Sequence, residues 1–116
     1  MKLTIVGLGL LGTSLGLALK AANPAIQITG HDPDPELAKR AKKLGAIDQS
    51  HWNLLAACTE AELIVLDLSL DELAKSFPAR RDDLREGALL VDTAPIKAPV
   101  LAWAAEILPQ TVQYVG

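Results

Sequence analysis

The chain has 116 residues, half of them hydrophobic, with only four aromatic residues and a formal net charge of −3. This length accommodates one small domain with an aliphatic core, as in the buried strands of a parallel sheet. A mildly acidic chain without a basic face does not fit nucleic-acid binding. The single cysteine, Cys58, cannot form an internal disulfide and has no metal-ligand spacing around it, so no metal site is predicted.

Near the N-terminus, an apolar and partly β-branched run over residues 3–6 predicts a buried strand. Three glycines follow at Gly-x-Gly-x-x-Gly spacing, and a helical pattern continues directly from them. In a strand–turn–helix unit, Gly7 allows the tight turn, Gly9 lets a pyrophosphate approach the backbone, and Gly12 lets the helix pack closely on the strand. This context predicts a dinucleotide-binding turn, with a purely structural turn as the alternative.

The first helix is predicted over residues 10–22, and Asn23-Pro24 ends it. The N–H groups near Leu10 and Leu11, in its first turn, then face the phosphates with the helix dipole behind them. The uncharged run over residues 3–19 is too short and too rich in glycine for a membrane span or a signal peptide. We therefore expect no membrane insertion and a cytoplasmic location.

Two other features of this helix concern its packing and its hydroxyl groups. Gly12 and Gly16 lie four residues apart on one face, which would let the helix sit close to the sheet. The hydroxyls of Thr13 and Ser14 either contribute to phosphate binding or bond to a backbone carbonyl. The sequence leaves both interpretations open.

A second strand is predicted over residues 26–31, ending at Asp32, which comes twenty residues after Gly12. A dinucleotide fold places at this point the carboxylate that accepts hydrogen bonds from the adenosine ribose hydroxyls. A carboxylate there binds a free 2′-hydroxyl and repels a 2′-phosphate, so the sequence predicts NAD rather than NADP. Asp34 is interpreted differently, as the N-cap of the next helix.

The remaining chain alternates between helical and strand patterns. The helix that Asp34 caps begins at Pro35, and Gly45 ends it. Helices are predicted over residues 35–44, 54–57, 70–77 and 97–108, and strands over residues 46–50, 63–68, 88–92 and 112–115. The alternation predicts an α/β domain spanning residues 1–116, a Rossmann-type doubly wound parallel sheet in three α/β/α layers with strand order 3-2-1-4-5-6.

Three places have more than one interpretation. Asp67 is unusual within an apolar strand, and it contacts either a neighbouring backbone or a ligand at the carboxyl edge of the sheet. His51 and Trp52 are interpreted as loop residues, with a contribution to an adenine pocket as the alternative. The charged stretch over residues 79–85 is interpreted as a solvated helix face, with a phosphate site as the less favoured alternative.

Several segments together resemble the nucleotide-binding domain of prephenate and arogenate dehydrogenases over essentially the whole chain. They are the opening V-G-L-G-L-L-G-T-S-L-G-L-A-L, the H-D-P-D strand end, A-K-K-L-G-A-I-D, V-D-T-A-P-I-K-A-P-V and the terminal Q-Y-V-G. Those enzymes oxidatively decarboxylate prephenate or arogenate in tyrosine biosynthesis, using NAD or NADP. The resemblance implies pyrophosphate binding and ribose binding at the positions already described, and a position near the nicotinamide-side ribose for two more residues. The implied residues are Gly7, Gly9, Leu10, Leu11 and Gly12 for pyrophosphate, Asp32 for the adenosine ribose, and Ser69 and Thr93 for the nicotinamide side.

The sequence departs from the family pattern at two positions. The family commonly has V-D-x-G-S-x-K, and here Pro95 stands in the place of the serine. The fourth strand usually ends in an A-V-P-like segment, which here is Leu66-Asp67-Leu68-Ser69. Asp92 and Lys97 match the pattern, and their structural roles are a strand end and a helix start.

In this family a G-H-P motif follows the Y-V-G-like strand, and its histidine assists oxidation of the substrate hydroxyl. This chain ends at Gly116, before that motif and before the helical domain that completes the substrate pocket and forms the dimer. We therefore expect a fragment without catalytic residues, inactive on its own, from a parent homodimer that acts on prephenate or arogenate.

Two other classes stay open. One is another dehydrogenase of this fold, such as a 3-hydroxyacid dehydrogenase or a pyrroline-carboxylate reductase. The other is a non-enzymatic nucleotide-sensing domain of a potassium transporter, against which the L-G-A-I-D and V-D-T-A-P-I-K-A-P-V segments argue.

Overall fold

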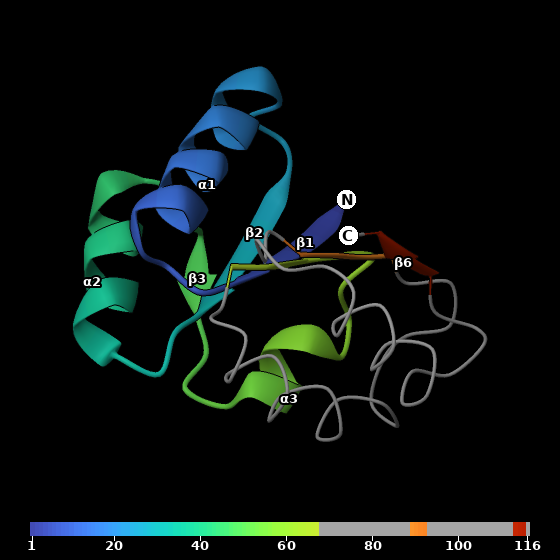
Figure 1. The fold of residues 1–116 in the computed structure, drawn as a ribbon. Helices are drawn as coiled ribbons and strands as arrows, with labels where there is room; N and C mark the ends of the chain where they lie inside the picture. Colours follow the sequence, from blue (N-terminus) through green and yellow to red (C-terminus); the bar gives the residue numbers. More distant parts are fainter. Residues whose placement is uncertain (68–88, 93–112, 116) are drawn as a thin grey trace.

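The computed structural model of the protein describes residues 1–67, 89–92 and 113–115. Six strands form one parallel sheet in the order β3-β2-β1-β4-β5-β6 (Figure 1). This order confirms the predicted doubly wound topology, in which the chain reverses direction across the sheet between β1 and β4. The strands are β1 (Lys2–Val6), β2 (Gln27–His31), β3 (Gln49–Ser50), β4 (Leu63–Leu66), β5 (Leu89–Asp92) and β6 (Gln113–Val115).

Helices lie on both faces of this sheet, as the three-layer prediction requires. Figure 1 shows α1 (Leu10–Ala22) and α2 (Pro35–Leu44) on one face and the short α3 (Leu54–Cys58) on the other. The capping residues act as predicted. The Asp34 carboxylate accepts a hydrogen bond from the Glu36 N–H at 3.0 Å, and Gly45 ends α2 in the left-handed conformation with φ +85°.

The third strand is shorter than predicted, because a side chain replaces part of its ladder. The Asp48 N–H donates to the Ile28 carbonyl at 2.8 Å, as a strand residue would. The Ile28 N–H, however, donates to the Asp48 carboxylate at 2.8 Å and not to a backbone carbonyl. Regular pairing therefore begins only at Gln49.

The other strand ends differ from the prediction by one or two residues. β4 ends at Leu66, which pairs with Val6, the last residue of β1. β5 and β6 lie within their predicted ranges, and residues 88 and 112, the predicted first residue of each strand, lie outside the described residues. The helices predicted over residues 70–77 and 97–108 and the charged stretch over residues 79–85 lie outside the described residues.

The core is aliphatic, as the composition predicts. Full burial of an aliphatic side chain contributes roughly 1.5–3 kcal/mol to folding, so the core residues account for much of the stability of the sheet. On the α3 face, the buried Thr4 hydroxyl donates to the Ala57 carbonyl at 2.5 Å, and Cys58 is fully buried. The largest fully buried side chains are those of Leu3, Ile5, Val6, Leu8, Ile28, Ile64 and Leu66.

Candidate functional site

The glycine turn, residues 7–12, lies at the carboxyl end of β1 and is closed by two tight backbone contacts. Gly7 has φ +96°, and a Cβ atom there would lie 2.0 Å from the Asp67 carbonyl oxygen. A Cβ atom at Gly12 would lie 2.0 Å from the Gly7 carbonyl oxygen. Both positions therefore require glycine, as predicted, although Gly12 brings α1 against the turn more closely than against the strand itself.

Gly9 differs from these two glycines, because a Cβ atom there would meet no protein atom within 4 Å. It is the N-cap of α1, and no side chain of Gly9 can cap the helix. The next two N–H groups, those of Leu10 and Leu11, have no acceptor within the described residues. The backbone here is open to a ligand, which is the property that the predicted pyrophosphate site needs.

Gly16 confirms that small residues let α1 approach closely. A Cβ atom at this position would lie 2.4 Å from the Ala46 carbonyl oxygen. At Gly16, α1 therefore packs against the connection that leads into β3, and not against a strand of the sheet as predicted.

Asp32 follows β2 and is joined to the glycine turn by a hydrogen bond. The Leu8 N–H donates to its Oδ2 at 2.7 Å, and the Asp34 N–H donates to its Oδ1 at 2.8 Å. Each carboxylate oxygen has a second lone pair, so both can accept further bonds. The predicted ribose ligand and the predicted phosphate turn therefore form one connected unit.

Asp67 also enters this unit, which the sequence did not determine. Its N–H donates to the Val6 carbonyl at 2.7 Å, and its Oδ2 accepts the Gly12 N–H at 3.1 Å. Gly12 occupies the third position of α1, so a side chain from the end of β4 caps this helix in place of its own N-cap residue. The contact with a neighbouring backbone is thus confirmed, and a carboxylate within an apolar run was its signal in the sequence.

The hydroxyl of Thr13 binds the backbone. It is buried and donates to the Leu8 carbonyl at 2.9 Å, so it holds the glycine turn from within. Ser14 is exposed. Ser69 and Thr93, expected on the nicotinamide side, lie outside the described residues, as do Pro95 and Lys97, while Asp92 ends β5.

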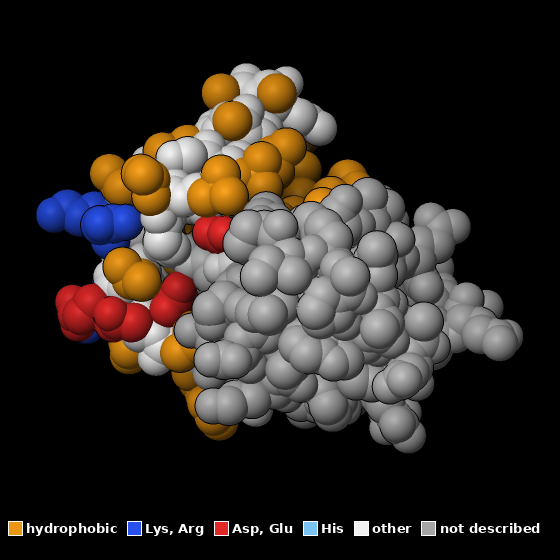
Figure 2. Space-filling model, in the orientation of Figure 1, with side chains coloured by type: hydrophobic (Ala, Val, Ile, Leu, Met, Phe, Trp, Pro, Cys, Tyr) orange, Lys and Arg blue, Asp and Glu red, His pale blue; other side chains and the backbone are white. Residues whose placement is uncertain are grey.

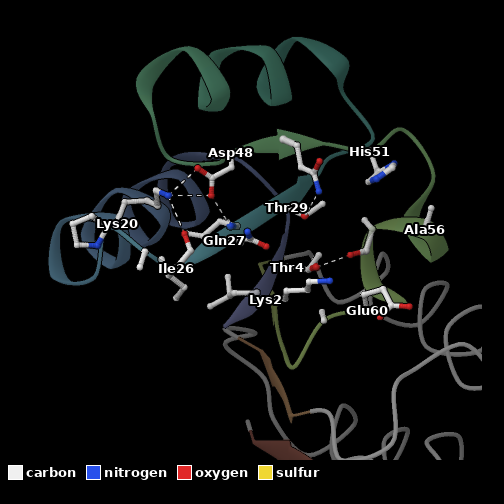
Figure 3. Close-up of a pocket in the computed structure, with 17 residues that line it drawn as sticks. Lys2, Thr4, Lys20, Ile26, Gln27, Thr29, Asp48, His51, Ala56 and Glu60 are labelled. Atoms are coloured by element: carbon white, nitrogen blue, oxygen red, sulfur yellow. Dashed lines mark hydrogen bonds and ion pairs between the residues drawn. The ribbon is translucent and has the colours of Figure 1, made fainter.

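A cavity of about 630 Å³ opens elsewhere, between strand residues on the α3 face and the end of α1 (Figure 3). Lys20, from the last turn of α1, donates to the Asp48 carboxylate at 2.8 and 3.0 Å and to the Ile26 carbonyl at 2.9 Å. The hydrogen bond from Lys20, together with that from the Ile28 N–H, holds the pKa of Asp48 below its usual value of 3.8. No residue of the glycine turn and neither Asp32 nor Asp67 lines this cavity.

His51 lines that cavity, and its carbonyl accepts a hydrogen bond from Nδ1 of the nearly buried His31 at 2.8 Å. Trp52, the next residue, is 89% exposed in the connection between β3 and α3. Both are loop residues, as the preferred interpretation has it.

The exposed surface of α1 is largely apolar (Figure 2). Figure 2 shows hydrophobic side chains gathered over α1, where Leu10 and Leu11 are exposed, and charged side chains over α2. Within the described residues, no three His, Cys, Asp or Glu side chains could hold a metal ion, and no helix is long and apolar enough to cross a membrane.

A parallel sheet in this order, a glycine turn that opens onto a helix N-terminus and an acid at the end of β2 define a Rossmann-type nucleotide-binding domain. Residues 15–116 match the family described as prephenate dehydrogenase, nucleotide-binding domain. The chain belongs to this family, as the resemblance implied. The match favours the first of the three classes considered.

Individual relatives agree with this assignment. The chain is 34% identical to the prephenate dehydrogenase of Lactococcus lactis over 99% of its length and to that of Bacillus subtilis over 100%. It spans 32% of each of these proteins, about a third of their length. Among solved structures, it resembles the A. aeolicus prephenate dehydrogenase in complex with hydroxyphenyl propionate and NAD+, with a TM-score of 0.86 and 22% identity over 97% of this chain and 40% of that one. The structural similarity supports the fold.

Proposed function

We propose that this chain binds NAD at the glycine turn, as the nucleotide-binding part of a dehydrogenase that oxidatively decarboxylates prephenate or arogenate. One observation carries the proposal, namely the 2.7 Å hydrogen bond from the Leu8 N–H to Asp32. This bond links Asp32, the proposed ribose ligand, to the glycine turn, the proposed phosphate site. Both lie at the carboxyl edge of the sheet, where the strand order reverses between β1 and β4. Ligands of open α/β sheets bind in this crevice.

In the proposed complex, the adenosine ribose hydroxyls donate to Asp32, and the diphosphate accepts hydrogen bonds from the N–H groups of Leu10 and Leu11. The open position of Gly9 lets the diphosphate reach the backbone. Bound NAD supplies the hydride acceptor. Ser69 and Thr93 lie near the nicotinamide-side ribose in this proposal.

Substrate binding, the oxidation step and dimerisation are assigned to other parts of a longer, cytoplasmic protein. The curated relatives are about three times as long as the matched segment, and their names give prephenate as the substrate. We propose that this chain forms one domain over residues 1–116. It binds the cofactor without oxidising prephenate, and prephenate-dependent NADH formation by the chain alone would contradict this division.

Calorimetric titration with NAD and NADP tests the proposal directly. We expect tighter binding of NAD, because the Asp32 carboxylate repels the 2′-phosphate of NADP. Asp32→Ala should weaken NAD binding by about tenfold or more and narrow the preference for NAD. The ratio of the affinities for NAD and NADP is the more specific measure, since a general structural change would weaken the binding of both ligands equally.

Asp34→Ala is the matched control, because Asp34 is also a carboxylate that accepts a backbone N–H, two residues away. It should destabilise α2 by about 1 kcal/mol and leave NAD affinity unchanged. Absence of NAD binding by the unsubstituted chain, or an unchanged affinity ratio in Asp32→Ala, would contradict the proposal.

A further inference from the structure

We propose that Asp67 sets the strength of dinucleotide binding, by placing a negative charge at the helix end that receives the diphosphate. This inference rests on the proposed NAD site. Asp67 is 55 residues from Gly12 in the sequence, yet its Oδ2 lies 3.1 Å from the Gly12 nitrogen. The carboxylate thus occupies the third N–H group of α1, next to those of Leu10 and Leu11.

The backbone leaves Asp67 little freedom to move away from the turn. Its carbonyl oxygen lies 2.0 Å from the position that a Cβ atom of Gly7 would take, and its N–H donates to the Val6 carbonyl. The side chain therefore starts from a fixed position against the glycine turn. A bound diphosphate and this carboxylate share one helix N-terminus, and both are anions.

Two consequences follow for a ligand. The carboxylate offsets part of the positive helix end that attracts phosphate, and it holds the Gly12 N–H that phosphate could otherwise bind. Like charges a few ångströms apart at a partly exposed site should lower affinity by about three- to tenfold. Asp67 would then keep cofactor binding moderate and favour its release.

Titration with ADP-ribose isolates the repulsion between the Asp67 carboxylate and the diphosphate. ADP-ribose carries the diphosphate without the nicotinamide cation, so attraction between that cation and the carboxylate does not contribute. Asp67→Asn removes the charge and keeps an oxygen that accepts the Gly12 N–H. We expect this variant to bind ADP-ribose about three- to tenfold more tightly than the unsubstituted chain at low salt. The gain should shrink at high salt, since salt screens exposed charges and leaves a neutral structural effect in place.

Asp34→Asn is the control, since it neutralises a carboxylate at the N-terminus of α2, and its ADP-ribose affinity should not change. Asp67→Ala is the second variant, in which the Gly12 N–H also becomes accessible, and its gain should be at least as large. Binding of ADP-ribose and NAD by the unsubstituted chain with no gain in either Asp67 variant, or a gain that salt does not reduce, would overturn this inference and leave the proposed function intact. Failure of all proteins to bind either ligand would overturn both.

Discussion

The carboxylates at the two edges of the sheet are held in different ways. At the amino edge, Asp48 forms an ion pair with Lys20 and has a lowered pKa. At the carboxyl edge, Asp32 and Asp67 accept hydrogen bonds from backbone N–H groups of the glycine turn. An amide partner orients a carboxylate but carries no compensating charge.

This difference separates an ion pair within the protein from the proposed ligand site. The Lys20 ammonium donates three hydrogen bonds within the protein, so the charge of Asp48 is already balanced locally. The carboxylates of Asp32 and Asp67 are instead oriented by backbone N–H groups beside the N-terminus of α1. In the proposed complex, the ribose hydroxyls donate to the Asp32 carboxylate, and the diphosphate is repelled by the Asp67 carboxylate.

The largest effect is expected for Gly7→Ala, which would break the geometry of the carboxyl edge. The added Cβ would lie 2.0 Å from the Asp67 carbonyl at φ +96°, so β4 or the turn must move. We expect a loss of about 3 kcal/mol or more in the free energy of unfolding, measured by urea denaturation.

Gly45→Ala is the control for this prediction, because Gly45 has φ +85° with no atom near its Cβ position. It should cost only about 1 kcal/mol, the cost of the left-handed conformation. Equal losses in the two variants would show that the close approach at Gly7 contributes nothing.

Gly9→Ala tests whether the open part of the turn serves a ligand and not the fold. No protein atom lies within 4 Å of the added methyl group. Unfolding free energy should stay within about 0.5 kcal/mol, while NAD affinity falls by about tenfold, since the methyl group occupies the approach of the diphosphate. Calorimetry and denaturation on the same sample check both, and an unchanged affinity would count against a diphosphate at Gly9.

The smallest effect is expected at the amino edge, for Asp48→Asn. Its carboxylate is partly exposed, so the ion pair and the hydrogen bond to Ile28 together should contribute no more than about 1 kcal/mol at neutral pH. NAD affinity should not change, because this carboxylate lines the cavity and not the glycine turn. Denaturation and NAD titration at neutral pH measure the two quantities.

The pH dependence of this contribution follows from the lowered pKa of Asp48. The unfolded chain binds a proton there more readily than the folded chain, so the stabilisation is present above the usual pKa of 3.8 and disappears as the pH falls through the lowered value. Asp48→Asn should therefore lose less stability than the unsubstituted chain on acidification. An identical pH profile in the two proteins would contradict the assignment.

Features that depend on neighbouring residues were predictable from the sequence. The bounds of α1 and α2, the Asp34 cap and the stop at Gly45 all match, because side-chain periodicity and capping act within a few residues. The strand order was predictable too, since alternating strands and helices with right-handed crossovers allow few arrangements.

Contacts between distant segments were decided only by the tertiary structure. In the sequence, Asp67 is distinguished only as a carboxylate in an apolar strand, and the pairing of β1 with β4 brings it to Gly12. The ion pair between Lys20 and Asp48 was not predicted, and neither was the hydrogen bond from the Ile28 N–H to Asp48 that shortens β3. A sequence specifies which groups are charged and which backbone positions need glycine, whereas the partner of a carboxylate depends on which strand ends meet in space, and that is set by packing across the whole sheet.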